Sequence, residues 1–206
     1  MGAARLFGLR FRRRGHSGAG DVTAKTLTLF PLADSDVLIA GDLSSKGANI
    51  RSSSTLRGET LVYTIEHNNP VMLPFDDAWS WNLGLTTQIP LELDGSIGVG
   101  SMGLTFDKMM LEHLNISQGV GEVEIILPDG DYRAEIDQAI GQILVEIPQG
   151  VPIRFGVSKG ISGLSLPSDF EKYNDYYYSP GARGMDDFIH IEINQAIGNI
   201  IVRYER

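Results

Sequence analysis

The sequence predicts an all-β protein that folds as a β-solenoid, a right-handed parallel β-helix-like stack of coils of about 20 residues each. Apolar and polar residues alternate with a period of two over much of the chain, which is typical of β-strands. Glycine is abundant, with 24 residues, which favours turns. The phrase QAIG occurs twice, in DQAIGQILVEIP at 137–148 and in NQAIGNIIVRYE at 194–205, which indicates a repeat.

The two phrases belong to a series of related segments, each centred on a glycine with apolar residues four and six positions later. The glycines are spaced by 21, 20, 19 and 38 residues, and they are Gly100, Gly121, Gly141, Gly160 and Gly198. We interpret each of them as a corner where a Cβ atom would clash or where φ is positive. Equivalent positions would then stack at the strand spacing of about 4.8 Å and form apolar ladders inside the solenoid.

A sandwich of antiparallel strands is the alternative, because alternation alone fits both architectures. The constant offsets around the glycine favour the solenoid. The repeat at Gly160 departs from the pattern, since Lys159 replaces the apolar residue before the glycine and Ser162 replaces the one two positions after it.

The remaining segments are assigned by their relation to the repeats. Residues 1–20 are expected to be a basic, disordered tail. Residues 21–84 are expected to form an N-terminal β cap, because a bare solenoid end exposes an open strand edge. The solenoid itself covers 85–206, and the long spacing of 38 predicts an inserted loop at 168–187 that projects from it.

The insert holds four of the seven tyrosines, and they are Tyr173, Tyr176, Tyr177 and Tyr178. Tyrosine is enriched at protein interfaces, so these residues are a candidate interaction surface. The alternative is that the loop lays its rings back on a face of the solenoid. The sequence leaves both possibilities open.

Both tryptophans, Trp79 and Trp81, lie close to the Asp76–Asp77 pair. An aromatic shelf beside carboxylates could bind sugar, so the two tryptophans are added to the candidate interaction surface. Their spacing of two residues equally fits two rings that point the same way and plug the end of the solenoid.

The net charge of −9 is unevenly distributed. Five of the 17 basic residues and none of the acidic ones lie within 1–14, so the remainder carries 12 basic against 26 acidic residues, a net charge of −14. Such a body repels nucleic acid, and we expect no nucleic-acid partner. Contact with a membrane surface would have to use the tail, through Arg10, Arg12, Arg13 and Arg14.

The sequence offers no motif for catalysis, metals or cofactors, and we expect none of the three. The chain has no cysteine, which excludes disulfides, thiolate zinc sites and thiol nucleophiles. The four histidines are not at ligand spacing, and the turn with Asp129 and Asp131 is far short of a calcium-binding motif. No stretch approaches the ~18 apolar residues that span a bilayer, and the first residues lack the apolar core of a signal peptide, so a cytoplasmic location is expected, with membrane association left open.

The segments IPLELDGSIGVGSMGLTFD and NISQGVGEVEIILP, together with the two QAIG phrases, resemble the toast-rack domains of LiaF-like cell-wall-active antibiotic response proteins and related adhesin-like domains. The resemblance covers roughly 85–206, and 22–84 resembles the N-terminal toast-rack segment found beside it. It implies a stacked-strand β-solenoid without established catalytic residues. LiaF-like proteins carry transmembrane helices ahead of this domain, and this sequence departs from that pattern.

We therefore expect a non-enzymatic bacterial scaffold or interaction domain with a protein partner, linked to the cell-envelope stress response through the resemblance. The alternatives are a self-assembling or adhesin-like structural protein, which includes a homo-oligomer, and a polysaccharide-binding or polysaccharide-acting β-helix protein.

Overall fold

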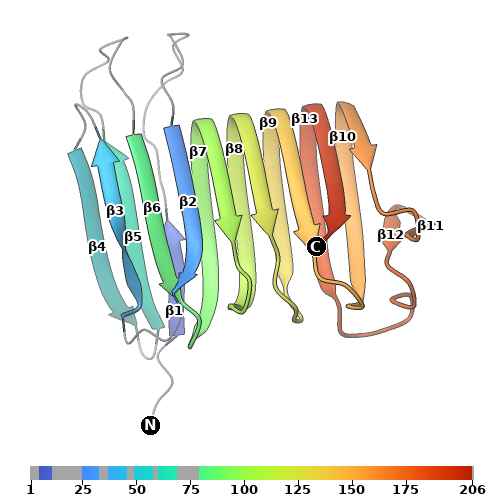
Figure 1. Ribbon diagram of the computed structural model, residues 1–206, viewed down its shortest axis with the longest axis horizontal. Coiled ribbons are helices and arrows are strands. Elements are labelled where there is room, and N and C mark those ends of the chain that lie inside the picture. The colour runs from blue at the N-terminus through green and yellow to red at the C-terminus, as the bar shows by residue number, and fades with distance from the viewer. Residues whose placement is uncertain are drawn as a thin grey trace.

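The computed structural model describes residues 5–10, 25–32, 37–45, 49–57, 60–68 and 79–205. These residues form an all-β structure, and no helix occurs among them (Figure 1). The expected fold class is therefore confirmed at the level of an all-β protein. The handedness of the predicted solenoid stays a prediction.

The strands fall into a mixed N-terminal group and a C-terminal group of mostly long strands. The first group is β1 (Arg5–Arg10), β2 (Lys25–Leu32), β3 (Ile39–Ser45), β4 (Asn49–Arg57), β5 (Thr60–Asn68) and β6 (Trp79–Thr86). The second group is β7 (Pro90–Thr105), β8 (Met110–Ile126), β9 (Arg133–Ile147), β10 (Ile153–Ser165), β11 (Glu171–Tyr173), β12 (Tyr176–Tyr178) and β13 (Ile189–Tyr204).

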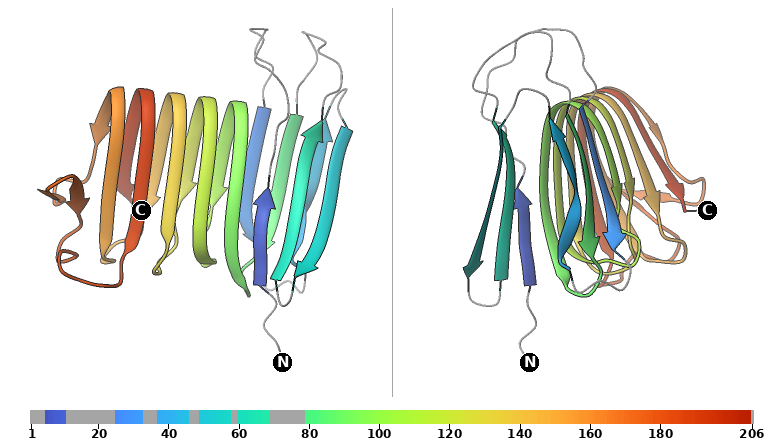
Figure 2. Two further views of the ribbon diagram at one scale, coloured as in Figure 1. Left: turned by 180° about the vertical axis from the view of Figure 1, so that it is seen from behind. Right: turned by 60° about the vertical axis from the view of Figure 1, so that its left-hand side comes forward.

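The five long strands β7, β8, β9, β13 and β10 bend in the middle, so that each contributes to two facing layers (Figures 1 and 2). The pairing of β7 shows this directly. Its first half, Leu91–Asp94, pairs with β1, whereas its second half, Ser101–Leu104, pairs with β2. We call the sheet of first halves the first layer and the sheet of second halves the second layer.

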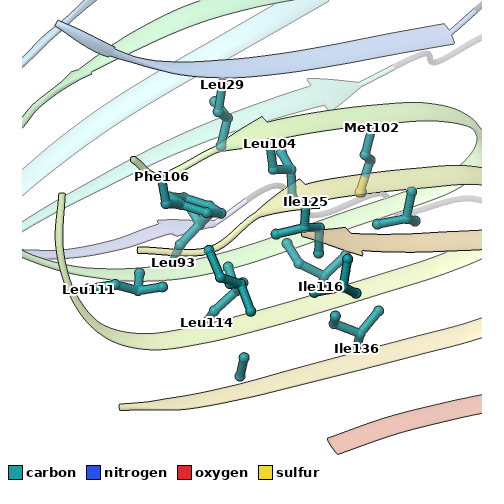
Figure 3. Packing of buried hydrophobic residues seen from close by; sticks show 14 of the residues in the cluster. Leu29, Leu93, Met102, Leu104, Phe106, Leu111, Leu114, Ile116, Ile125 and Ile136 are labelled. Carbon is teal, nitrogen blue, oxygen red and sulfur yellow. The ribbon is translucent and has the colours of Figure 1, made fainter. Parts of the chain in front are cut away.

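The register of the stack matches the predicted repeat at four of its five glycines. Gly100 pairs with Gly121, Gly121 with Gly141, and Gly141 with Gly198, all between parallel strands. The apolar residues at equivalent offsets therefore stack in ladders between the layers, as the close view of Leu93, Leu114 and their neighbours shows (Figure 3). Side chains point alternately to the two faces of a strand, so every second side chain in each half of a bent strand points into the core between the layers.

The order of the strands differs from the order of the repeats in the sequence. The first layer runs β11-β12-β10-β13-β9-β8-β7-β1-β5-β4, so the last repeat is inserted between the third and the fourth. The two QAIG phrases, 57 residues apart, are direct neighbours: Gln138 pairs with Gln195 and Ile140 with Ile197. An interpretation in which the repeats stack in chain order is therefore wrong.

The predicted corner at Gly160 is also corrected. In β10 the residue opposite Gly198 is Ser162, and Gly160 lies two positions earlier, without the positive φ of the other corner glycines. A shift of two residues along a strand keeps every side chain on the same face. The alternation of apolar residues therefore could not distinguish the two registers.

The N-terminal strands extend both layers of the stack. β1, β5 and β4 continue the first layer, and β2, β6 and β3 continue the second (Figure 2). Because β2 pairs with both β6 and β7, the sheet is continuous across the expected boundary at residue 84.

Residues 5–10 form strand β1, which differs from the expected disordered tail. The physical reason is that the first half of β7 has a free edge, and β1 fills it by pairing with β7 on one side and β5 on the other. Residues 11–24 lie outside the described residues.

Candidate functional site

The bend of the long strands requires glycine for two separate reasons. The φ angles of the four stacked corner glycines lie between 143° and 147°, a region that other residues rarely adopt. In addition, a Cβ atom added to Gly141 would lie 1.8 Å from the carbonyl oxygen of Gly121 in the next strand. Adjacent backbones therefore approach at the bend as closely as glycine permits.

Three glutamines form a buried hydrogen-bonded ladder just inside this bend. Gln118, Gln138 and Gln195 each lie three positions before the corner glycine, and they are 3%, 3% and 2% exposed. The Gln138 side-chain amide donates to Gln118 Oε1 at 2.5 Å and to the Gly121 carbonyl at 3.1 Å. The Gln195 amide repeats the pattern, donating to Gln138 Oε1 at 2.6 Å and to the Gly141 carbonyl at 3.1 Å. The ladder thus adds side-chain hydrogen bonds between neighbouring bent strands at the bend.

The ladder ends at β10. Gln118 starts it by donating to the Gly100 carbonyl at 2.9 Å, but β10 places Lys159 opposite Gln195. The Lys159 ammonium donates instead to the carbonyl of Ser162 in its own strand, at 2.7 Å. Among the described residues, Gln195 Oε1 has no hydrogen-bond partner although it is buried. The ladder therefore stops at Gln195 in β13, and β10 stacks on β13 without a side-chain hydrogen bond at this position.

A row of aliphatic side chains runs along the outside of the bend, one from each long strand. We call this the bend row, and its members in spatial order are Val99, Val120, Ile140, Ile197 and Ile161. Val99 is half-buried, and the exposures of the other four are 42%, 45%, 47% and 82%. Contiguous exposed apolar surface on a soluble protein commonly marks an interaction site.

A shallow groove of about 620 Å³ lies beside the bend row. Its walls include Ser117, Asp137, Asn194 and Ser158, which occupy equivalent positions in four adjacent strands. The Asn194 side-chain amide donates to Asp137 at 2.8 Å. The bend thus presents an apolar ridge and a parallel line of hydroxyl, amide and carboxylate groups.

The tyrosine-rich insert folds back onto the stack as a hairpin of β11 and β12. Tyr176, Tyr177 and Tyr178 form β12, which pairs antiparallel with the first half of β10. All three tyrosines are half-buried, whereas Tyr173 in β11 is 45% exposed. The insert therefore extends an edge of the first layer by two short strands. An interaction role for its tyrosines stays a prediction.

A stacked arginine fixes the hairpin to β13. The Arg154 guanidinium lies 5.0 Å from the ring centroid of Tyr176 and 4.6 Å from that of Phe188. Its Nη2 lies 3.0 Å from His190 Nδ1, and His190 Nε2 lies 3.0 Å from a carboxylate oxygen of Glu192. Because arginine can only donate, His190 accepts at Nδ1 and donates to Glu192 from Nε2, which requires the neutral ring.

This network makes the stability of the protein depend on pH. Burial lowers the pKa of His190 below its ordinary value, Arg154 adds to the decrease, and Glu192 opposes it. The unfolded chain therefore binds this proton more tightly, so the contribution is complete above about pH 6.5 and is lost as the pH falls below it. We expect the melting temperature of a His190→Asn variant to fall less between pH 7.5 and pH 5 than that of the wild type.

The control is His113→Asn, which removes a histidine outside the network. Its melting temperature should follow the wild-type pH profile. An equal fall for wild type and His190→Asn would contradict the expected coupling.

The tryptophans and the basic tail are placed only in part. Trp81 is 2% exposed and belongs to the core, which corrects the expectation that it lies on an exposed interaction surface. The side chains of Trp79 and Arg10 are outside the description, and Arg12, Arg13 and Arg14 lie outside the described residues altogether.

Within the part of the chain that the structure describes, no three histidine or acidic residues are grouped so that they could hold a metal ion. The turn with Asp129 is closed by Tyr132, whose hydroxyl donates to the Pro128 carbonyl at 2.8 Å. In the same residues, no helix is long and apolar enough to cross a membrane.

A family model for the N-terminal domain of toast-rack proteins, DUF2154, matches residues 17–146. This is more than half of the chain. The chain belongs to the toast-rack family. The match runs from the N-terminal segment through β9, so it confirms the resemblance and extends beyond the segment at 22–84 that resembled this N-terminal part.

The toast-rack chain is also similar to a solved structure, that of a candidate cell adhesion protein from Clostridium sporogenes ATCC 15579 at 1.95 Å resolution. The similarity covers 99% of this chain and 94% of the other, with a TM-score of 0.81 and 18% sequence identity. At that identity the similarity establishes the fold alone. The sequence matches no curated protein.

Sequence reasoning missed two features of this toast-rack domain, the glutamine ladder and the bend row. A signal for the ladder was present, since glutamine occurs three positions before the corner glycine in three of the five repeats. A signal for the bend row was also present, because an aliphatic residue precedes four of the five corner glycines. Its position on the outside of the bend was not predicted.

Proposed function

We propose that this toast-rack chain is a non-enzymatic scaffold that binds a partner protein along the bend. The bend row is the observation that carries the proposal. Ile140 and Ile197 are 45% and 47% exposed, although a corner needs no aliphatic residue on its outer side. Exposed aliphatic side chains in adjacent strands gain free energy only when a partner covers them.

The groove beside the row supports a protein as the partner. Protein interfaces combine an apolar centre with a polar rim that makes hydrogen bonds. Asp137, Asn194 and Ser158 offer such a rim next to the row. Aliphatic, amide and hydroxyl groups provide binding contacts, whereas they offer no strong acid, base or nucleophile, which is why the proposal is a binding function.

An adhesin-like structural role is a second candidate. It is supported by the structural similarity to a candidate cell adhesion protein and by the membership of the toast-rack family. A link to the bacterial cell-envelope stress response, with a cytoplasmic and membrane-associated location, is the finer form of the proposal. It rests on the family resemblance, and labelling of the chain in fractionated cells would test the location.

The test compares the binding of a partner by the wild type and by an Ile140→Ser/Ile197→Ser variant. Mass spectrometry identifies the partner that the immobilised wild type retains. We expect the affinity of this partner for the variant to be at least about tenfold lower than for the wild type. A tenfold loss corresponds to only about 1.4 kcal/mol of binding free energy. A matched variant, Glu112→Ser/Glu124→Ser, changes two exposed residues of β8 away from the row and should bind normally.

A Tyr173→Ser variant tests the competing surface. Tyr173 is exposed, so its replacement leaves the pairing of β12 with β10 in place. Loss of binding in this variant, with normal binding by the Ile140→Ser/Ile197→Ser variant, would place the partner on the hairpin and overturn the proposal.

A further inference from the structure

The two ends of the stack are open strand edges in both layers. The first layer ends at β4 on one side and at β11 on the other. The second layer ends at β3, which pairs only with β6, and at the second half of β10, because β12 covers no more than Arg154–Gly156. Within the described residues nothing pairs with the outer side of these four edges (Figures 1 and 2).

The two ends of the first layer carry opposite charge. β4 has two arginines, Arg51 and Arg57, and no acidic residue, and all its residues from 51 to 57 are exposed. The insert at the other end, 168–187, has five acidic residues against two basic ones. Glu171 and Asp175 are the acidic residues in and next to the terminal strand β11, and both are exposed.

Placing one end against the other therefore brings the arginines of β4 against the acidic residues of the insert. The second layer adds no such pair, because the second half of β10, residues 162–165, has no charged residue.

The strand directions also suit this arrangement. The strands from β5 to β10 in the first layer run parallel, whereas β4 runs antiparallel to β5. β11 runs parallel to β10, because each pairs antiparallel with β12. When a second copy follows by translation along the stack, β4 of one copy lies antiparallel to β11 of the next.

We propose that copies of this chain associate head to tail, with the β4 edge of one copy against the β11 edge of the next. The open edges supply backbone hydrogen bonds, and cross-strand pairs of opposite charge add specificity. A two-fold arrangement would place arginines against arginines or acidic hairpins against each other, which disfavours it. A head-to-tail contact is heterologous, so it produces rings or filaments.

The experiment reverses the charge of each end separately, at low ionic strength. The Arg51→Glu/Arg57→Glu variant makes the β4 end acidic, so that both ends of its first layer are acidic. The Glu171→Lys/Asp175→Lys variant makes the β11 end basic, so that both ends are basic. Sedimentation velocity at rising protein concentration should show assembly of the wild type, with at least about a tenfold shift in the concentration required by either variant alone. An equimolar mixture of the two variants should assemble again, because each end then finds a complementary partner. Added salt should weaken assembly, since exposed charges are screened.

A matched variant, Glu112→Lys/Glu124→Lys, reverses two exposed charges in the middle of the stack and should assemble as the wild type does. Circular dichroism confirms that each variant is folded before it is compared. A wild type that remains monomeric at every concentration overturns the proposal, and so does a mixture of folded variants that fails to assemble. All three charge variants keep the bend row, so the binding of a partner there is measured independently of the assembly.

Discussion

Replacing Gly141 by alanine destabilises the fold by at least about 3 kcal/mol, because two separate costs add at one site. Gly141 has a φ of 143°, which strains any residue with a Cβ atom. The new Cβ would also lie 1.8 Å from the carbonyl oxygen of Gly121, which is backbone and cannot rotate away. Chemical denaturation measures the loss as a shift of the midpoint.

Gly103→Ala is the matched control for this change. Gly103 lies in β7, its φ is not in the positive range, and no atom lies within 4 Å of an added Cβ. Alanine there should leave stability unchanged within about 0.5 kcal/mol or raise it slightly, because it restricts the unfolded chain. Equal effects of the two substitutions would show that the bend does not depend on glycine.

Replacing Gln138 by leucine costs about 3 kcal/mol or more, because it breaks the glutamine ladder at its centre. The Gln118 side-chain oxygen and the Gly121 carbonyl lose a donor, and the Gln195 amide loses one of its acceptors. Each buried polar group left without a partner costs about 1–3 kcal/mol. The free energy of unfolding, from urea titration, measures the loss.

Gln142→Leu provides the comparison. The Gln142 side chain makes a long, exposed contact of 3.4 Å with Glu122 on the outer surface. Its loss should change stability by less than about 0.5 kcal/mol. A Gln138→Leu variant as stable as Gln142→Leu would mean that the ladder contributes little to the stack.

The order of the strands shows where the sequence pattern failed and why. β10 and β13 carry the same inward alternation, so either could follow β9. Gln195 favours β13 as the neighbour of β9, because its amide donates to Gln138 Oε1. Lys159, at the equivalent position of β10, donates to a carbonyl of its own strand instead. Such a choice depends on which side chains meet across strands, and alternation along one strand carries no information about it.

The insert illustrates the same limit. Its position at 168–187 follows from the spacing of the repeats, and its tyrosines could be expected either to project or to lie back. In the structure, the insert pairs through β12 with the first half of β10, because the backbone groups at that open edge gain hydrogen bonds. That edge is exposed only because β13, and not β10, stacks on β9.

The sequence by itself determined the strand content, the 20-residue repeat and the corner glycines 100, 121, 141 and 198. These are local properties, set by alternation and by the steric requirement for glycine at the bend. Only the tertiary structure decided the strand order, the corner at Ser162, the place of β1 and the surfaces left exposed. These depend on contacts between segments far apart in the sequence, such as the hydrogen bonds of Gln195 to Gln138 and to Gly141, which the pattern along one strand does not specify.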